Sequence, residues 1–319
     1  MFFATLWPLI LASSAYSASA SALHNGRNIR AAAADPICGT TVDPAAIAAS
    51  EANVRRHISE TSVRSRQHDN SSVLLPIDVY MQVLSADGTE EGGNIRDATI
   101  EAQLQVLNDA FKPVGFQFRL IDTIRTINER WYYNLKPVGD VEKEVIQLRR
   151  GGNATLNIYT MGALNTTTQA WGTVPSELSI HDGVFQNGTV FLGGSDPEFN
   201  LGDTLVHEVG HWFGLYHTFA YGCEKSYDYV DDTPIEDQPP VLGGCDVGRD
   251  SCPDQPGLDL VREVKLTQTL NPDNYMSYSS DECRNSWTPG QIQRMREQMA
   301  KYRGVVYPGI IVGDIPEDS

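Results

Sequence analysis

The chain has 319 residues, of which 41% are hydrophobic and 20% charged. These proportions are ordinary for a globular protein and exclude a wholly disordered chain. The formal net charge is −17, and a field of this sign repels phosphate backbones, which argues against nucleic acid as a partner. No stretch is apolar over a length that would span a bilayer, so we expect no membrane association.

The first 20 residues have the composition of a secretory signal peptide. An apolar run covers residues 2–12, and small residues follow it up to Ala18-Ser19-Ala20, which fits the small-x-small pattern of cleavage sites. Because only the terminal amine supplies positive charge before the run, the alternative is the start of a buried helix. We predict a signal peptide at 1–20 and a secreted, extracellular protein in which disulfides can form.

The next stretch, residues 21–67, is rich in Ala, Ser and Arg and contains no aromatic residue, so little in it can anchor a core. We interpret it as a pro-segment that precedes the main domain at 68–319. Within it, residues 44–66 are predicted to form a basic helix. Exposed arginines in this helix are candidate cleavage sites for a processing protease, namely Arg55, Arg56, Arg64 and Arg66.

The main domain opens with alternating strands and helices. Period-two alternation predicts strands, and apolar residues three or four apart predict helices. The order strand, helix, strand, helix, strand is expected for residues 73–84, 95–111, 115–127, 141–149 and 155–161. Residues 183–192 are predicted to form a hairpin through Asn187-Gly188, and residues 201–213 a further helix.

The segment HEVGHWFGLYH, which begins at His207, matches the pattern H-E-x-x-H-x-x-G-x-x-H at every fixed position. Because histidines four residues apart lie on one helical face, His207 and His211 can reach one ion, with Glu208 beside them. Gly214 is expected to take a positive φ, which ends the helix and brings His217 to the ion as a third ligand. Three protein ligands and an open fourth position are typical of catalytic zinc.

A single histidine among the seven in the chain is better explained as an ordinary core or surface residue, but the complete pattern is not. The predicted chemistry is hydrolysis of a peptide bond. Zinc polarises the carbonyl and lowers the pKa of its water, while Glu208 takes the proton and passes it to the leaving amine. The back of the helix is expected to be buried through Leu201, Leu205, Val206, Val209 and Trp212, with its polar face lining a cleft.

Residues 73–303 resemble the metzincin clan of metalloproteases and, within it, the pappalysin family, which includes ulilysin-like and secreted fungal members. The resemblance is carried by the zinc motif and by four short runs, His217-Thr218-Phe219, Asp232-Thr233-Pro234, Asn274-Tyr275-Met276-Ser277-Tyr278 and Trp287-Thr288-Pro289-Gly290-Gln291. It implies an α+β fold of two subdomains, with a mixed, twisted sheet and helices above the cleft and a loop-rich, disulfide-stapled part below. It also implies one catalytic Zn²⁺ ion.

The same resemblance assigns roles to two residues of the run that starts at Asn274. Met276 is implied to be the methionine of a turn beneath the metal. Tyr278 resembles tyrosines that donate to the oxyanion in some metzincins. The alternative for Tyr278 is a side chain that only packs on the turn.

The five cysteines divide into one in the pro-segment and four in the C-terminal part. The four can pair in three ways, and similarity to ulilysin-like enzymes favours Cys223 with Cys252 and Cys245 with Cys283. Cys38-Gly39-Thr40 resembles the cysteine-switch element of latent family members, in which a thiolate fills the open position on zinc. The alternative is an unpaired or intermolecular cysteine.

Several acidic and asparagine residues complete the candidate sites. Calcium ligands are expected in an acidic loop, for which a solvated charged face is the alternative, at Asp228, Asp231, Asp232, Glu236 and Asp237. Asp281 and Glu282 are expected to border a substrate pocket and to favour a basic residue there. Four N-x-S/T sequons predict glycosylation in surface loops, at Asn70, Asn153, Asn165 and Asn187.

We therefore predict a secreted, monomeric zinc endopeptidase that acts on proteins or peptides. The first alternative is a catalytically silent zinc-binding module that recognises a protein partner, against which the intact Glu208 argues. The second is an acidic adhesive or lectin-like protein with an incidental metal site, which leaves the third histidine and the Met-containing turn unexplained.

Overall fold

The computed structural model describes residues 38–40, 44–60, 74–162, 168–175, 181–220, 222–224, 228–237, 245, 250–254 and 273–308. All of them lie in one unit, Ala34–Ser319. The predicted signal peptide, the arginines Arg64 and Arg66 and the sequons Asn70 and Asn165 lie outside the described residues. In the part that is described, no helix is long and apolar enough to cross a membrane.

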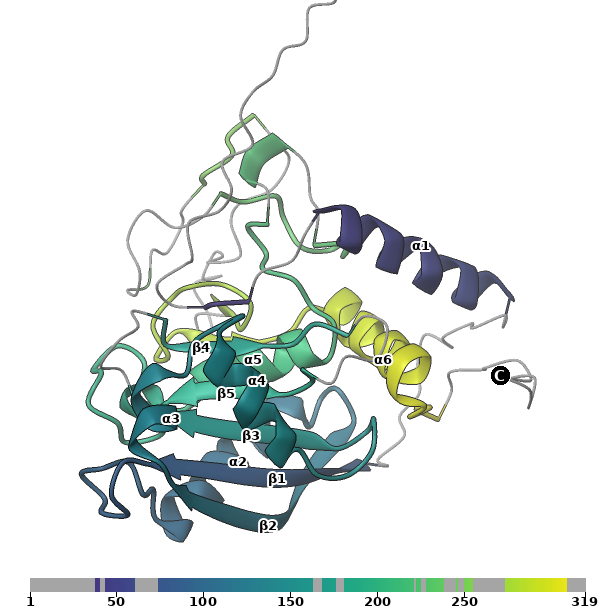
Figure 1. Ribbon diagram of the computed structural model, residues 1–319. Coiled ribbons are helices and arrows are strands. Elements are labelled where there is room, and N and C mark those ends of the chain that lie inside the picture. The colour runs from purple at the N-terminus through teal and green to yellow at the C-terminus, as the bar shows by residue number, and fades with distance from the viewer. Residues whose placement is uncertain are drawn as a thin grey trace, which may run out of the picture. The chain divides into compact units, whose positions relative to one another are not determined.

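Five strands form one mixed sheet in the order β2-β1-β3-β5-β4 (Figure 1). The central strand β1 (Leu75–Ser85) pairs in parallel with β2 (Phe116–Ile127) and with β3 (Leu156–Met161), and β3 pairs in parallel with β5 (Val184–Asn187). The edge strand β4 (Ala170–Gly172) is antiparallel to β5. Parallel neighbours need crossover connections, and α2 (Asp97–Phe111) lies in the connection between β1 and β2.

Apolar side chains leave the sheet on both faces, as the strand period requires. On one face, Val79 and Met81 of β1 belong to the larger cluster, which also includes residues of the helices α2, α5 and α6. On the other, Tyr159 and Met161 of β3 pack in a smaller cluster with residues of the short helix α4 and the 3-10 turn η1. The helices are α1 (Pro44–Glu60), α2 (Asp97–Phe111), α3 (Glu129–Asn134), α4 (Asp140–Val145), η1 (Ile146–Leu148), α5 (Asp203–Trp212) and α6 (Pro289–Arg303).

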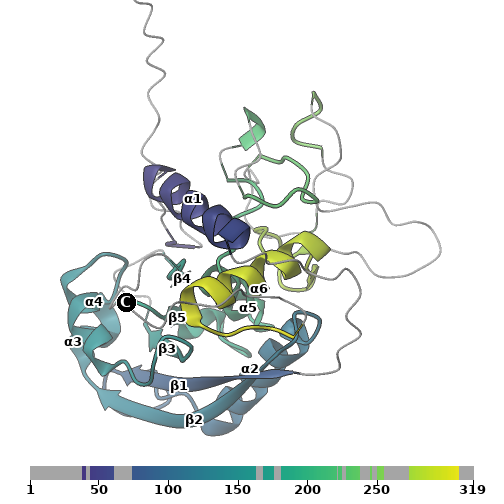
Figure 2. The same cartoon turned by 90° about the vertical axis from the view of Figure 1, so that its right-hand side faces the viewer.

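The helix α1 lies beside α6, as both views show (Figures 1 and 2). The helix α1 starts at Pro44 as predicted and ends at Glu60, before the predicted end at residue 66. Its Arg55 and Arg56 are exposed as expected. The three strands and two helices predicted between residues 73 and 161 all form, with ends that differ by a few residues.

The predicted hairpin at 183–192 is wrong. Strand β5 ends at Asn187, and Gly188–Val190 forms the 3-10 turn η2 instead of a return to an antiparallel partner. The Oδ1 of Asn187 accepts a hydrogen bond from the N–H of Thr189 at 3.0 Å and so caps this turn. The Asn-Gly pair therefore starts a helical turn, because the asparagine side chain bonds to the backbone two residues on.

The described residues between α5 and α6 contain little regular structure. The described elements are the turn η3 (Gly222–Glu224) and a parallel pair of short strands, β6 (Asp273–Asn274) and β7 (Arg284–Ser286). Two disulfides link this part, Cys223 to Cys252 and Cys245 to Cys283, with Cα separations of 5.4 and 6.0 Å. Crosslinks of this kind stabilise a region that lacks a large core of its own. The expected α+β fold is confirmed.

Candidate metal centre

The helix α5 is anchored at its N-terminal end by a buried carboxylate. The Oδ2 of Asp281 accepts hydrogen bonds from the N–H groups of Leu201, Gly202 and Asp203 at 2.9, 3.0 and 3.2 Å. These groups have no partner inside a helix, and negative charge is favourable at this end. Asp281 also forms a buried ion pair with Arg284.

The other end of α5 is closed by glycine, as expected. Gly214 has a φ of +94°, and a Cβ on it would lie 2.6 Å from Cγ of Gln298. Both the conformation and the close approach exclude a larger residue. The chain turns here and brings His217 toward the polar face of the helix, where it stacks on Phe219.

Three imidazole nitrogens converge on one point. The Nε2 atoms of His207, His211 and His217 are separated by 3.2, 3.2 and 3.1 Å. Zinc binds histidine nitrogen at about 2.0–2.1 Å, so two nitrogens at tetrahedral positions lie about 3.3 Å apart. The three side chains therefore have the spacing that one zinc ion requires.

Backbone carbonyls orient two of these rings. The Nδ1 of His207 lies 2.7 Å from the carbonyl oxygen of Tyr275, and the Nδ1 of His211 lies 2.8 Å from that of Leu215. Because a carbonyl only accepts, each Nδ1 carries the proton and each Nε2 presents its lone pair to the centre. Burial lowers the pKa of His207 and of His217 and lowers that of His211 to about 4. The rings are therefore neutral, as metal binding requires.

Met276 packs directly against α5 from below. A Cβ on Gly210 would lie 2.6 Å from the Sδ of Met276, so this glycine allows the turn to approach the helix. The N–H of Thr218 donates to the carbonyl oxygen of Met276 at 3.4 Å, which joins the turn to the segment after His217. The apolar back of α5 is buried as expected except at Leu201, which precedes the helix and is 51% exposed.

Glu208 lies fully buried between the histidines and the described part of the N-terminal segment. Its Oε2 accepts from the Oγ1 of Thr40 at 3.3 Å and from the Sγ of Cys38 at 3.5 Å. Its Oε1 has no hydrogen-bond partner among the described residues. Burial is the main cause that raises the pKa of Glu208 to about 8, so this arrangement holds the carboxyl in its protonated form at neutral pH.

The segment Cys38-Gly39-Thr40 extends along the edge strand β4. Cys38 forms a parallel bridge with Ala170, and the N–H of Gly39 donates to the carbonyl oxygen of Ala170 at 2.8 Å. The Oγ1 of Thr40 accepts from the N–H of Gly172 at 3.0 Å and lies 3.1 Å from the carbonyl oxygen of the same residue. These contacts place the thiol of Cys38 over the three histidines.

The thiol has the position of a fourth ligand. The Sγ of Cys38 lies 3.5 Å from the Nε2 of His211, and one ligand atom from each of the four residues lies within 4.8 Å of the others. With zinc–sulfur and zinc–nitrogen distances of about 2.3 and 2.05 Å, tetrahedral neighbours lie about 3.6 Å apart. The donor set of three imidazoles and one thiol therefore fits zinc. Cys38 is the only cysteine outside the two disulfides.

Tyr278 borders the same centre. Its hydroxyl lies 3.3 Å from the Nε2 of His217, and its ring contacts those of His217 and Phe219. The residue is buried. The phenol thus reaches His217 while the ring packs against Phe219, a geometry that fits both interpretations of Tyr278.

The acidic loop does not form a second metal centre among the described residues, where no three of its carboxylates converge. Asp228 instead accepts from the N–H of Val230 and the hydroxyl of Thr233 within its own loop. Asp232 accepts from the hydroxyl of Thr288 at 2.7 Å and from the N–H of Gly290 at 2.8 Å, at the start of α6. The geometry gives the expected calcium site no support.

The expectation that Asp281 favours a basic substrate residue is wrong. Its carboxylate is buried, pairs with Arg284 and binds the N-terminal end of α5, so it is not available to a substrate. Its neighbour Glu282 is exposed. Of the two described sequons, Asn153 is exposed, whereas Asn187 is only 3% exposed and caps a turn. A surface-loop position is therefore correct for Asn153 and wrong for Asn187.

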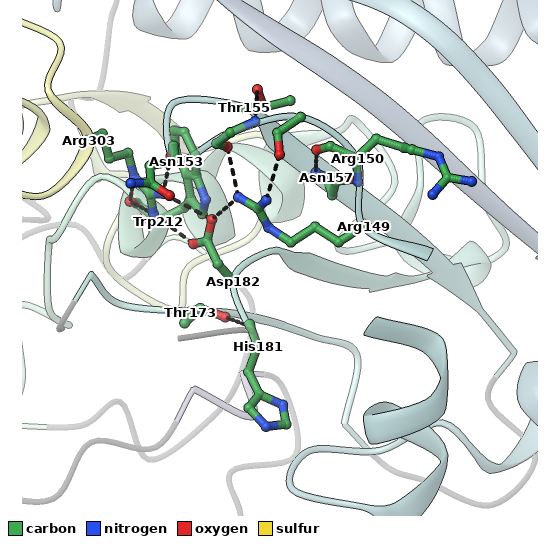
Figure 3. A network of polar contacts seen from close by, with 12 residues as sticks. Arg149, Arg150, Asn153, Thr155, Asn157, Thr173, His181, Asp182, Trp212 and Arg303 are labelled. Carbon is green, nitrogen blue, oxygen red and sulfur yellow. Dashed lines mark hydrogen bonds and ion pairs between the residues drawn. The ribbon is translucent and has the colours of Figure 1, made fainter. Parts of the chain in front are cut away.

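Figure 3 shows an ion-pair network at the C-terminal end of α5. The sequence did not predict this network. Asp182 accepts from Arg303 at 2.9 and 3.0 Å and from Arg149 at 3.1 Å. Arg303 also donates to the carbonyl oxygens of Trp212 and Asn153. The network joins α5, α6 and the segments on either side of β3, and nothing in the spacing of these residues indicates that they meet.

Comparisons with known proteins place this geometry in context. Residues 152–300 match the profile of the peptidase M43 family, described as pregnancy-associated plasma protein-A. An extracellular metalloprotease of Pyricularia oryzae is 41% identical over 234 residues, which cover 72% of this chain and 76% of the relative. An extracellular metalloprotease of Verticillium alfalfae is 37% identical over 269 residues, which cover 82% of this chain and 88% of the relative.

Solved structures with the same fold include two of mirolysin. Tannerella forsythia promirolysin matches with a TM-score of 0.59 and 23% identity, covering 81% of this chain and 87% of its own. Mature mirolysin in complex with a cleaved peptide matches with a TM-score of 0.53 over 75% of this chain and 100% of its own. At this identity the likeness shows the fold alone.

Proposed function

Because the chain belongs to the pappalysin family of zinc metalloendopeptidases, we propose that His207, His211 and His217 hold the catalytic zinc and that Glu208 is the general base. The observation that carries the proposal is the convergence of three Nε2 atoms at 3.1–3.2 Å around a position beside a buried carboxylate. Proteins and peptides are the substrates.

The roles follow from the chemistry of the side chains. Zinc, when bound, polarises the scissile carbonyl and lowers the pKa of a nearby water. Glu208 takes a proton from that water and passes it to the leaving amine, so no covalent intermediate is needed. The hydroxyl of Tyr278, 3.3 Å from the Nε2 of His217, donates to the developing oxyanion.

The N-terminal segment is proposed to hold the precursor latent. Residues 1–20 are the signal peptide, 21–67 the pro-segment and 68–319 the mature enzyme. The contact of Cys38 with His211 and the hydrogen bond of Thr40 to Glu208 support the proposed latency, because together they engage a proposed metal ligand and the proposed general base. A Cys38 thiolate bound to the ion would exclude the water that hydrolysis needs.

Secretion is supported by the relatives, which are named extracellular metalloproteases. The two disulfides agree with an oxidising compartment. We propose that the mature form acts as a monomer and that Asn153, whose side chain is exposed, is the described sequon that can carry a glycan.

A direct test is hydrolysis of casein by the purified mature form, with and without 1,10-phenanthroline, alongside metal analysis. Activity that the chelator abolishes and zinc restores supports the proposal. One zinc per chain without turnover would instead support a binding module. No bound zinc at pH 7.5 would contradict the assignment of the three histidines as ligands.

A further inference from the structure

The helix α1 buries one face that is not purely apolar. Ile47, Glu51 and Val54, spaced as neighbours on one side of a helix, are 5%, 4% and 3% exposed. Ala52 is exposed on the other side, and Arg55 is exposed at the edge of the buried face. A buried carboxylate is costly without a partner, so the surface under α1 has to contain a matching cation.

That cation is Arg294 of α6. Its Nη1 and Nη2 donate to the two carboxylate oxygens of Glu51 at 3.0 and 2.6 Å, and the hydroxyl of Tyr216 donates to the same carboxylate at 3.2 Å. The guanidinium lies 5.0 and 5.8 Å from the ring centroids of Tyr216 and Tyr229. Two parallel hydrogen bonds in a buried setting are the strongest form of this ion pair.

Two further contacts extend this surface, one of them on α6. The Oγ of Ser50 lies 2.8 Å from the hydroxyl of Tyr302, and Arg55 lies over the ring of Tyr229. Tyr216 directly precedes His217 in the chain, but its hydroxyl is hydrogen-bonded to Glu51, and none of these contacts includes Cys38 or Thr40. The contacts of α1 and those of Cys38 therefore lie on different parts of the domain.

We infer that Arg294, Tyr216, Tyr229 and Tyr302 form a docking site for α1, distinct from the contacts of Cys38, that holds the pro-segment by a second anchor. The inference rests on the proposed latency of the precursor. Two contacts joined by a short piece of chain reinforce each other, because binding at one raises the effective concentration at the other. Loss of Glu51 leaves Arg294 buried without its carboxylate, which is strongly destabilising.

The second anchor changes what cleavage can achieve. Arg55 and Arg56 are exposed, and a cut after either leaves Cys38 and Glu51 on one fragment. That fragment keeps both contacts and stays bound without a covalent link. Activation then requires the fragment to dissociate or to be degraded, and not only a cut in the chain.

The test uses the full precursor with Glu208→Ala, which prevents self-cleavage. Cys38 is the one thiol outside the disulfides, so its rate of modification by DTNB reports opening of the pro-segment. We expect Glu51→Gln to raise this rate about ten-fold or more. The matched control, Ala52→Gln, places the same residue one position along on the exposed side and should leave the rate unchanged. Equal rates for Glu51→Gln and the parent would overturn the inference.

A second measurement does not depend on the thiol. After limited trypsin cleavage at Arg55 or Arg56, the fragment should co-elute with the domain in gel filtration for the parent and separate from it for Glu51→Gln. A parent fragment that separates at once would also overturn the second anchor. Neither readout requires turnover, so failure of the second anchor is distinguishable from an inactive mature form in the casein assay.

Discussion

Arg303, the last residue of α6, caps the C-terminal end of α5, the helix that contains His207 and His211, by donating to the carbonyl oxygen of Trp212. Its Nε and Nη2 lie 3.3 and 3.0 Å from that oxygen, and its guanidinium lies 3.5 Å from the Trp212 ring centroid. Carbonyls at this end of a helix have no partner within it, and a cation there is favourable. Asp182 holds the guanidinium in place (Figure 3). The contact fixes where α5 ends, just before Gly214.

We predict that Arg303→Gln lowers the free energy of unfolding by about 1.5–3 kcal/mol, because it removes the charged hydrogen bonds to Asp182, which is partly buried and keeps Arg149 as a partner. Urea unfolding monitored by fluorescence measures the change. The control is Lys301→Gln on the same helix, for which we expect a change within about 0.5 kcal/mol. A loss of less than about 1 kcal/mol for Arg303→Gln would mean that the network does not support α5.

Glu208→Ala is expected to keep zinc and lose activity. The carboxylate is not needed as a ligand, because the three histidines have the spacing to bind the ion without it. A general base, in contrast, raises the reaction rate about 10²–10⁴-fold. Metal analysis and peptide hydrolysis by the mature variant measure the two effects separately. Glu101→Gln, an exposed change on α2, is the control. Full turnover by Glu208→Ala with zinc bound would refute the general-base role.

Cys38→Ser should make the uncleaved precursor active. Serine is a much poorer zinc ligand than a thiolate, so the position that Cys38 holds, 3.5 Å from the Nε2 of His211, opens to water. Peptide hydrolysis within the first minutes, with a gel to show that the chain is intact, measures this. A thiol-blocking reagent added to the wild-type precursor should act in the same direction. A Cys38→Ser precursor as latent as wild type would contradict the switch.

The parts that could be predicted from the sequence are those set by local spacing. His207 and His211 follow from the helical period, and the positive φ of Gly214 follows from the chain reversal that His217 needs. The long strands and helices before residue 161 have clear periodicity. The three-residue strand β4 is too short to show any, although it positions the segment that carries Cys38.

Long-range contacts account for what could not be predicted. Glu51 and Arg294 are 243 residues apart, and neither belongs to a motif. The buried face of α1 therefore contains a charged residue. An apolar residue at this position would have predicted that the helix packs against the domain. The role of Asp281 could not be predicted for the same reason. A carboxylate after the Met-containing turn is expected at the surface, and only the tertiary structure shows that it binds the N-terminal end of α5.

The metal-free precursor should also reveal the cost of burying Glu208. Burial raises the pKa of this carboxyl from 4.5 to about 8, so its contribution to stability is fully present below pH 4.5 and is lost as the pH rises through 8. Glu208→Gln removes this dependence. With chelator present, its melting temperature should match that of wild type near pH 4.5 and exceed it increasingly up to pH 8. The corresponding difference in the free energy of unfolding has an upper limit of about 5 kcal/mol, at about 1.36 kcal/mol per unit of pKa difference. Glu101→Gln should show no such divergence. Parallel profiles for wild type and Glu208→Gln would mean that the carboxylate ionises normally in the folded precursor.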